Sequence, residues 1–168
     1  MTPDRTALAT AVASQMPLAQ RLFDAIRQCS ADHVGVTRPA WSRQDQAAAQ
    51  IIAESAAELG LNVEWDPCGN LLCTMPGRDA DSPGVLTGSH LDSVPTGGHY
   101  DGLAGVIAGI IVLAAFRELN LKPACDVTTS GLRGEESVWY GIAYVGSRLA
   151  VGTLPLAQLD QLKRGDTG

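Results

Sequence analysis

The sequence predicts an α/β fold with a mixed, largely parallel sheet flanked by helices on both faces. Short strand-like segments alternate with segments whose apolar residues have helical spacing, and this alternation is typical of α/β domains. The longest apolar run, residues 102–116, has 15 residues. A membrane-spanning helix needs about 20, so we interpret this run as a helix buried inside the fold.

The N-terminal residues predict a leader followed by a helix. Residues 1–17 are rich in Ala, Thr and Ser and end at Pro17, so we expect a loosely held leader there. Residues 18–29 then have apolar side chains at helical spacing. Residues 18–168 are therefore the expected folded part of the chain.

A polar loop separates this helix from the next. Ser42, with Asp45 three residues later, is close to a capping box. The helix that Ser42 starts is expected to run through 47–59, and Gly60 is a suitable residue for its end. Beyond it we expect strands at 61–65, 71–75, 85–89 and 125–129, a buried helix at 102–119 and a last helix at 140–150.

The composition narrows the classes of partner. Of 168 residues, 45% are hydrophobic and 18% charged, which is typical of a globular domain, and the net charge is −6. This charge, without any run of Lys or Arg, argues against nucleic acid or a membrane as partner and favours small molecules. The four cysteines form no C-x-x-C pair, and the N-terminus lacks the pattern of a signal peptide. We therefore expect free thiols and a cytoplasmic protein.

Three groups with metal-binding chemistry follow strands or precede the buried helix. His90 comes directly after a strand, and Asp92 lies close enough in sequence to orient its imidazole. Asp101 stands immediately before the apolar helix, where the helix dipole favours a carboxylate. A loop histidine and a helix-capping aspartate would explain these residues without any metal.

Glu135 and Glu136 form the third group, just past the strand at 125–129. Adjacent carboxylates repel each other, and a bound cation would neutralise them, whereas a solvated acidic pair on a loop is the structural alternative. One carboxylate could bind metal while the other takes a proton from water. Together these groups predict a hydrolytic metal site, and an α/β domain without metal stays open as the alternative.

Two longer motifs resemble those of a known family. GSHLDSVPTGGHYDG (88–102) and RGEESVWYGIAYVGSR (133–148) are similar to the two metal motifs of the peptidase M20-like amidohydrolases. More narrowly, they resemble the hydantoinase/carbamoylase family, which includes N-carbamoyl-L-amino-acid hydrolases, β-ureidopropionases and allantoate amidohydrolases. The shorter GVTR (35–38) and DPCGNL (66–71) match lesser signatures, and the likeness covers about residues 18–165.

The resemblance implies a role for each candidate residue. His90 would bind one metal, Asp101 would bridge two, and Glu136 would bind the other. Glu135 would be the general base, and Asp92 would orient His90. The cofactors implied are two divalent ions, Zn or Mn, Co or Ni, within part of an M20-type phosphorylase/hydrolase-like catalytic domain.

The function implied is hydrolysis of a linear C–N amide or ureido bond, as in N-carbamoyl-L-amino acids, by a metal-activated water. Relatives supply further ligands in a C-terminal remainder that follows a dimerisation domain. We therefore expect residues 18–168 to be the N-terminal portion of such an enzyme, with weak or partial metal occupancy and no activity alone. As partners we expect a small-molecule ureide, and either a second copy of the chain or a missing C-terminal part. The alternatives are an M20-type aminoacylase or peptidase, and a non-catalytic truncated or split-gene fragment.

Overall fold

The computed structural model describes residues 4–163 and confirms the α/β class. Its four-stranded sheet has the order β1-β2-β4-β3. Only β3 and β4 pair in parallel, and the other two pairings are antiparallel. The sheet is less parallel than expected because a tight turn joins β1 to β2, and such a turn can connect only antiparallel strands. The strands are β1 (Asn62–Trp65), β2 (Leu71–Met75), β3 (Val85–His90) and β4 (Val127–Leu132).

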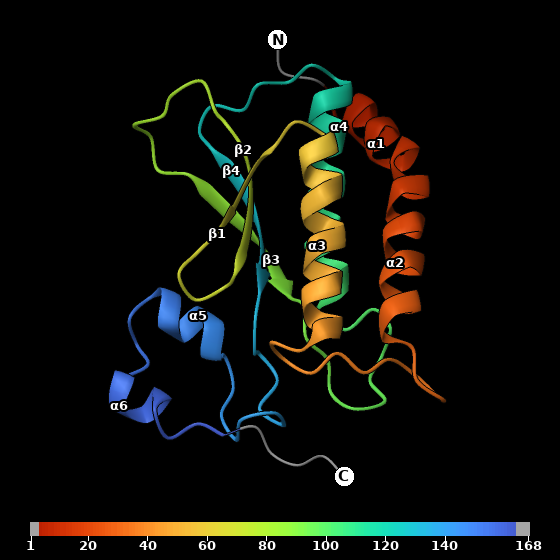
Figure 1. Cartoon of the computed structure of the whole chain (residues 1–168). Coiled ribbons are helices and arrows are strands. Elements are labelled where there is room, and N and C mark those ends of the chain that lie inside the picture. The colour runs from red at the N-terminus through yellow and green to blue at the C-terminus, as the bar shows by residue number, and fades with distance from the viewer. Residues whose placement is uncertain (1–3, 164–168) are drawn as a thin grey trace.

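The longer helices form a layer on one face of the sheet (Figure 1). Within this layer α3 packs against β1 and β2, whereas α4 packs against β3 and β4. Within residues 4–163 the helices of ten or more residues therefore cover one face, where the sequence predicts helices on both. These helices are α1 (Arg5–Ser14), α2 (Met16–Ser30), α3 (Arg43–Glu58) and α4 (Leu103–Glu118).

The structure differs from the expected loose leader over residues 1–17. Residues 5–14 form α1, an Ala-rich segment whose composition favours a helix. The carboxylate of Asp4 accepts a hydrogen bond from the backbone N–H of Ala7 (2.7 Å) and so caps the first turn. Ala11 is buried, and α1 packs against α4. Residues 1–3 lie outside the described residues.

One helix boundary agrees with the sequence expectation and one differs from it. α3 begins at Arg43, directly after the expected cap, because Ser42 Oγ accepts a hydrogen bond from the backbone N–H of Asp45 (3.2 Å). The last expected helix, 140–150, is shorter: α5 (Val145–Ala150) begins only after Tyr144, whose left-handed backbone (φ 63°) interrupts a helix. A further short helix, α6, spans Leu156–Leu159.

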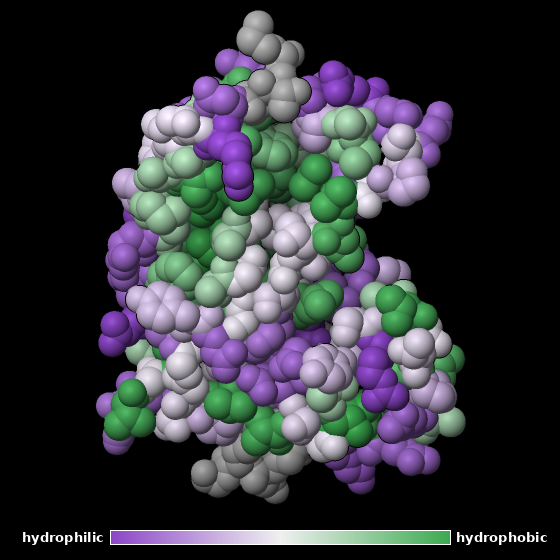
Figure 2. Space-filling model, turned by 180° about the vertical axis from the view of Figure 1, so that it is seen from behind, coloured by the Kyte–Doolittle hydropathy of each residue, from purple (hydrophilic) through white to green (hydrophobic). Residues whose placement is uncertain are grey.

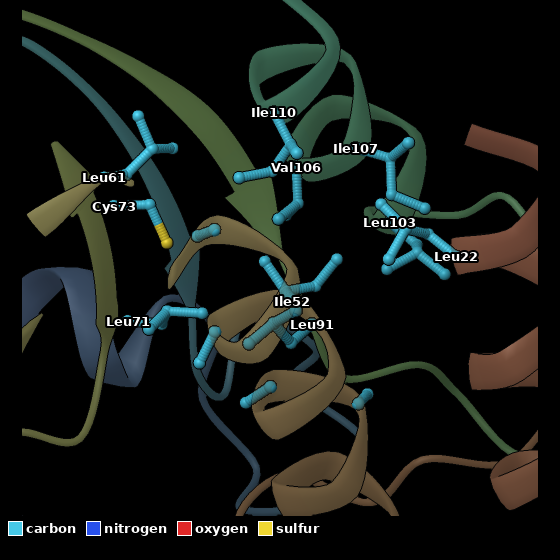
Figure 3. Close-up of a cluster of buried hydrophobic side chains, with 14 of the residues drawn as sticks. Leu22, Ile52, Leu61, Leu71, Cys73, Leu91, Leu103, Val106, Ile107 and Ile110 are labelled. Atoms are coloured by element: carbon cyan, nitrogen blue, oxygen red, sulfur yellow. The ribbon is translucent and has the colours of Figure 1, made fainter. Parts of the chain in front are cut away.

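The hydrophobic core lies between the sheet and the helical layer (Figure 3). Ile52 of α3 and Ile110 of α4 are fully buried there, as is Leu71 of β2. α4 comes so close to β4 that a Cβ at Gly109 would lie 2.4 Å from Oγ1 of Thr129. α4 is therefore a core helix, as its apolar sequence predicts. No helix within residues 4–163 is long and apolar enough to cross a membrane.

We expect Ile52→Ala to lower the free energy of unfolding by about 2–5 kcal/mol, because it removes buried methyl groups and leaves a cavity in the core. Val34→Ala is the matched control, since Val34 is 75% exposed, and it should change stability by less than about 0.5 kcal/mol. Urea denaturation followed by circular dichroism measures both. Equal losses from the two variants would contradict the described core.

Candidate metal centre

His90, the last residue of β3, presents one ring nitrogen to the candidate site. Its Nδ1 lies 2.9 Å from the backbone carbonyl oxygen of Asp92. Because a carbonyl can only accept a hydrogen bond, Nδ1 carries the proton and Nε2 keeps a free lone pair. Gly102 leaves room for the ring, since a Cβ there would lie 2.5 Å from the imidazole. The local structure thus selects the tautomer that a metal ligand at Nε2 needs.

The predicted ligands come together at one end of the sheet. Ligand atoms of His90, Asp101 and Glu136 all lie within 4.8 Å of one another. Nε2 of His90 is 3.7 Å from Oδ1 of Asp101 and 3.9 Å from Oε2 of Glu135. The Asp101 side chain is 49% exposed, so the cluster opens to solvent on one side.

The helix-capping explanation for Asp101 has little support in the structure. The N-cap residue of α4 is Gly102, and no side chain makes a capping hydrogen bond to this helix. The backbone carbonyl of Asp101, rather than its carboxylate, accepts from the N–H of Leu103 (2.6 Å). The carboxylate of Asp101 is therefore available to a ligand beside His90.

Asp92 holds the two halves of the cluster together. Its side chain is 0% exposed, and its two carboxylate oxygens accept from the backbone N–H groups of Glu135 and Glu136, each at 3.1 Å. The expected contact between its carboxylate and His90 is longer, 3.7 Å from Oδ1 to Nδ1. In this structure His90 is oriented by the carbonyl of Asp92, whereas the carboxylate fixes the loop that carries the two glutamates.

The electrostatics of the cluster suit a cation. Partial burial raises the pKa of Glu136, and the neighbouring carboxylate of Glu135 raises it further. A divalent ion would offset both effects, and an imidazole with carboxylates is a donor set that Zn²⁺ and similar ions accept. The residues present therefore fit a divalent metal.

A buried polar network beneath the glutamate loop was not predicted from the sequence. Arg133 is buried, and its Nε donates to Oδ2 of Asp45 on α3 at 2.6 Å. The side-chain carbonyl of Asn70 accepts from the backbone N–H of Arg133 (2.9 Å), and its amide donates to the carbonyl of Gly146 (3.1 Å). Burial raises the pKa of Asp45 to about 6, although Arg133 acts in the opposite direction. The network ties the start of the glutamate loop to α3 and to the turn after β1.

The other two histidines have different surroundings. The His99 ring lies against Phe23 and Tyr100, with centroid distances of 5.5 and 4.9 Å. His33 is exposed on the loop after α2. Neither belongs to the cluster of possible ligands around His90.

Comparison with known proteins finds amidohydrolases. An N-carbamoyl-L-amino acid amidohydrolase of Geobacillus stearothermophilus is 36% identical over 126 residues, which are 75% of this chain and 31% of that protein. A ureidoglycolate hydrolase of Arabidopsis thaliana is 32% identical over 90% of this chain and 32% of its own length. No family model matches the sequence.

Comparison with solved structures also finds an amidase. The crystal structure of a hydantoinase/carbamoylase family amidase from Burkholderia multivorans superposes with a TM-score of 0.81 at 31% identity, over 88% of this chain and 37% of the amidase. The Bacillus cereus aminopeptidase PepT, at 20% identity and a TM-score of 0.51, shows likeness of fold alone. The chain spans about a third of the length of the curated relatives described above.

The network beneath the site predicts a coupled loss of stability. At pH 8, where Asp45 is ionised, Asp45→Ala should cost about 3–5 kcal/mol, because it leaves the guanidinium of Arg133 buried and unpaired. Adding Arg133→Met removes that charge, so the double variant should lose less than the sum of the two single losses. Urea denaturation of the four proteins measures the coupling. Strictly additive losses would show that the pair does not act as a unit.

Proposed function

Because the chain belongs to the hydantoinase/carbamoylase family of amidohydrolases, we propose that it carries part of a metal centre for C–N bond hydrolysis. The substrate class is a linear amide or ureide, such as an N-carbamoyl-L-amino acid. The observation that carries this proposal is the convergence of His90, Asp101 and Glu136 within 4.8 Å. The names of the relatives, which are amidohydrolases and a ureidoglycolate hydrolase, support the reaction class.

The proposed centre takes two divalent ions. His90 would bind one through Nε2, Glu136 would bind the other, and Asp101 would bridge them with its two oxygens. The carboxylate of Asp101 is half exposed and lies within 4.8 Å of the ligand atoms of both His90 and Glu136, which supports the bridging role. The imidazole and carboxylate donors suit Zn, Mn, Co and Ni alike.

Glu135 is the proposed general base. Its Oε2 lies 3.9 Å from Nε2 of His90, and its side chain is partly exposed. Two bound divalent ions would lower the pKa of a shared water and polarise the substrate carbonyl. Glu135 would then accept a proton from the attacking water and return it to the departing nitrogen. The carboxylate of Asp92 accepts a hydrogen bond from the backbone N–H of Glu135 and would so fix the backbone position from which the Glu135 side chain extends.

The ligand count supports weak metal binding by this chain. Zinc in catalytic sites usually has three protein ligands. The described cluster offers His90 and Asp101 to one ion, and Asp101 and Glu136 to the other. We therefore propose partial occupancy, and no turnover by the 168 residues alone.

An apolar surface beside the sheet supports a polypeptide partner. Leu86 on β3 is 67% exposed, and Val85 on β3 and Val112 on α4 are also exposed. β3 is an edge strand of the sheet and packs against α4. Figure 2 shows hydrophobic residues gathered on the side of the molecule opposite to the view of Figure 1. Since the relatives are about three times as long, we propose that this surface receives a polypeptide corresponding to their remainder, rather than a second copy of the chain.

Metal binding tests the site directly. Titration with Zn²⁺ or Co²⁺, followed by calorimetry or by the Co²⁺ absorption spectrum, should show binding that His90→Ala weakens at least about tenfold, because it removes the only nitrogen ligand of the cluster. Asp101→Asn and Glu136→Gln should weaken binding as well. His33→Ala is the matched control and should leave affinity unchanged. An equal loss from both histidine variants would contradict the assignment.

An activity assay tests whether turnover requires metal ligands in addition to His90, Asp101 and Glu136. Ammonia release from N-carbamoyl-L-amino acids, with added Zn, Mn, Co or Ni, should stay at background for this chain, because the cluster found within residues 4–163 offers each ion only two protein ligands. Glu135→Gln serves as the control for any residual signal. Turnover that this substitution abolishes would overturn the expected inactivity, and at the same time it would support Glu135 as the base.

A further inference from the structure

Residues 91–93 connect three separate parts of the chain beneath the cluster. All three residues are fully buried. The backbone N–H of Leu91 donates to the carbonyl of Leu132 at the end of β4 (2.9 Å). The carbonyl of Ser93 accepts from Nε1 of the buried Trp139 (2.9 Å). Asp92 lies between them, so its position depends on how both neighbours are held.

Arg38 forms hydrogen bonds with both neighbours of Asp92. Its Nε donates to the carbonyl of Leu91 at 2.8 Å, and its backbone N–H donates to Oγ of Ser93 at 3.0 Å. The backbone N–H of Ser93 in turn donates to the carbonyl of Arg38 at 3.0 Å. One arginine therefore fixes the backbone on either side of Asp92.

Stability alone does not require a charge at this position. Arg38 is 0% exposed, and its Nη2 is buried without a hydrogen-bond partner within the described residues. Its remaining nitrogen, Nη1, reaches only the hydroxyl of Ser30, at 3.3 Å. No carboxylate within residues 4–163 lies within 4.0 Å of its guanidinium. A buried cation held in this way is costly compared with an apolar side chain of similar size.

Acidic residues of the surroundings act on the charge of Arg38. Burial lowers the pKa of its guanidinium, whereas Asp45, Asp92 and Asp101 act in the opposite direction. The fully buried guanidinium therefore carries a positive charge inside the protein.

We propose that Arg38 is a positioning residue for the metal centre, because it holds the segment 91–93 in the one arrangement that serves both halves of the site. In that arrangement the carbonyl of Asp92 meets His90, while its carboxylate meets the N–H groups of Glu135 and Glu136. The consequence for metal affinity rests on the proposed function. The mechanical coupling between Arg38 and the loop that carries Glu135 and Glu136 does not depend on the proposed function.

Two substitutions of Arg38 distinguish the effect of its hydrogen-bond geometry from the effect of its charge. Arg38→Lys keeps a cation but has no Nε donor at the place that meets Leu91, whereas Arg38→Met loses both. The control is Met75→Ala, a truncation in the core at the other end of the sheet. Met75 pairs with Val127 at the start of β4, whereas His90 pairs with Leu132 at its end. This control shows what loss of stability alone does to each readout.

The first readout is amide hydrogen exchange in metal-free protein. The N–H groups of Glu135 and Glu136 should exchange at least about tenfold faster in Arg38→Met, and by a smaller factor in Arg38→Lys, while the amide of Ile110 in α4 keeps its protection. Met75→Ala should not single out these two amides. Wild-type exchange at Glu135 and Glu136 in folded Arg38 variants would overturn the proposal. Should Arg38→Met not fold, Arg38→Lys alone decides it.

The second readout is Zn²⁺ or Co²⁺ affinity of the intact chain. Arg38→Lys should bind about tenfold more weakly than wild type, the lower end of what residues behind metal ligands contribute, whereas Met75→Ala should bind as wild type does. Unchanged affinity in both Arg38 variants would overturn the positioning role. If the wild type binds no metal while the two glutamate amides still respond to Arg38, the proposed function fails and the mechanical coupling stands.

Discussion

The site depends on the two hydrogen bonds that the Asp92 carboxylate accepts from the backbone of Glu135 and Glu136. These bonds join the loop after β3 to the loop after β4, and the same residue orients His90 through its carbonyl. A buried carboxylate bound to backbone N–H groups leaves little freedom for either loop. The side chains of His90, Asp101 and Glu136 can therefore meet without direct hydrogen bonds to one another.

The fold prepares this junction through one parallel pairing. β3 and β4 are the only parallel neighbours within the described sheet, so their carboxyl ends lie at the same edge. His90 pairs with Leu132 in this register, which places the two following loops side by side. Sites at the carboxyl ends of parallel strands are general in α/β folds. The antiparallel strands β1 and β2 complete the sheet, and the turn between them supports the glutamate loop through Asn70.

The sequence predicted the α/β class, the buried helix α4 and the strands, because hydrophobic period and turn residues report directly on which side chains are buried. It also indicated the candidate ligands, since His90, Asp101 and Glu136 stand next to predicted element ends. It did not predict α1, whose small residues give a weak apolar pattern, or the late start of α5. The burial of Arg38 and Arg133 was not predicted either, because arginine is rarely buried and its side chain alone does not reveal whether the guanidinium is buried or exposed. Asp92 uses its carbonyl to contact His90 and its carboxylate to bind the backbone of Glu135 and Glu136, and only the structure reveals these separate contacts.

A crystal structure from crystals grown with Zn²⁺, with anomalous data at the zinc edge, tests whether His90, Asp101 and Glu136 form one metal site. We expect an anomalous peak about 2.0–2.2 Å from Nε2 of His90 and from a carboxylate oxygen of Asp101, with Glu136 facing the same space. A zinc ion held elsewhere, by the cysteines for example, while these three side chains point away from one another, would contradict the proposed site.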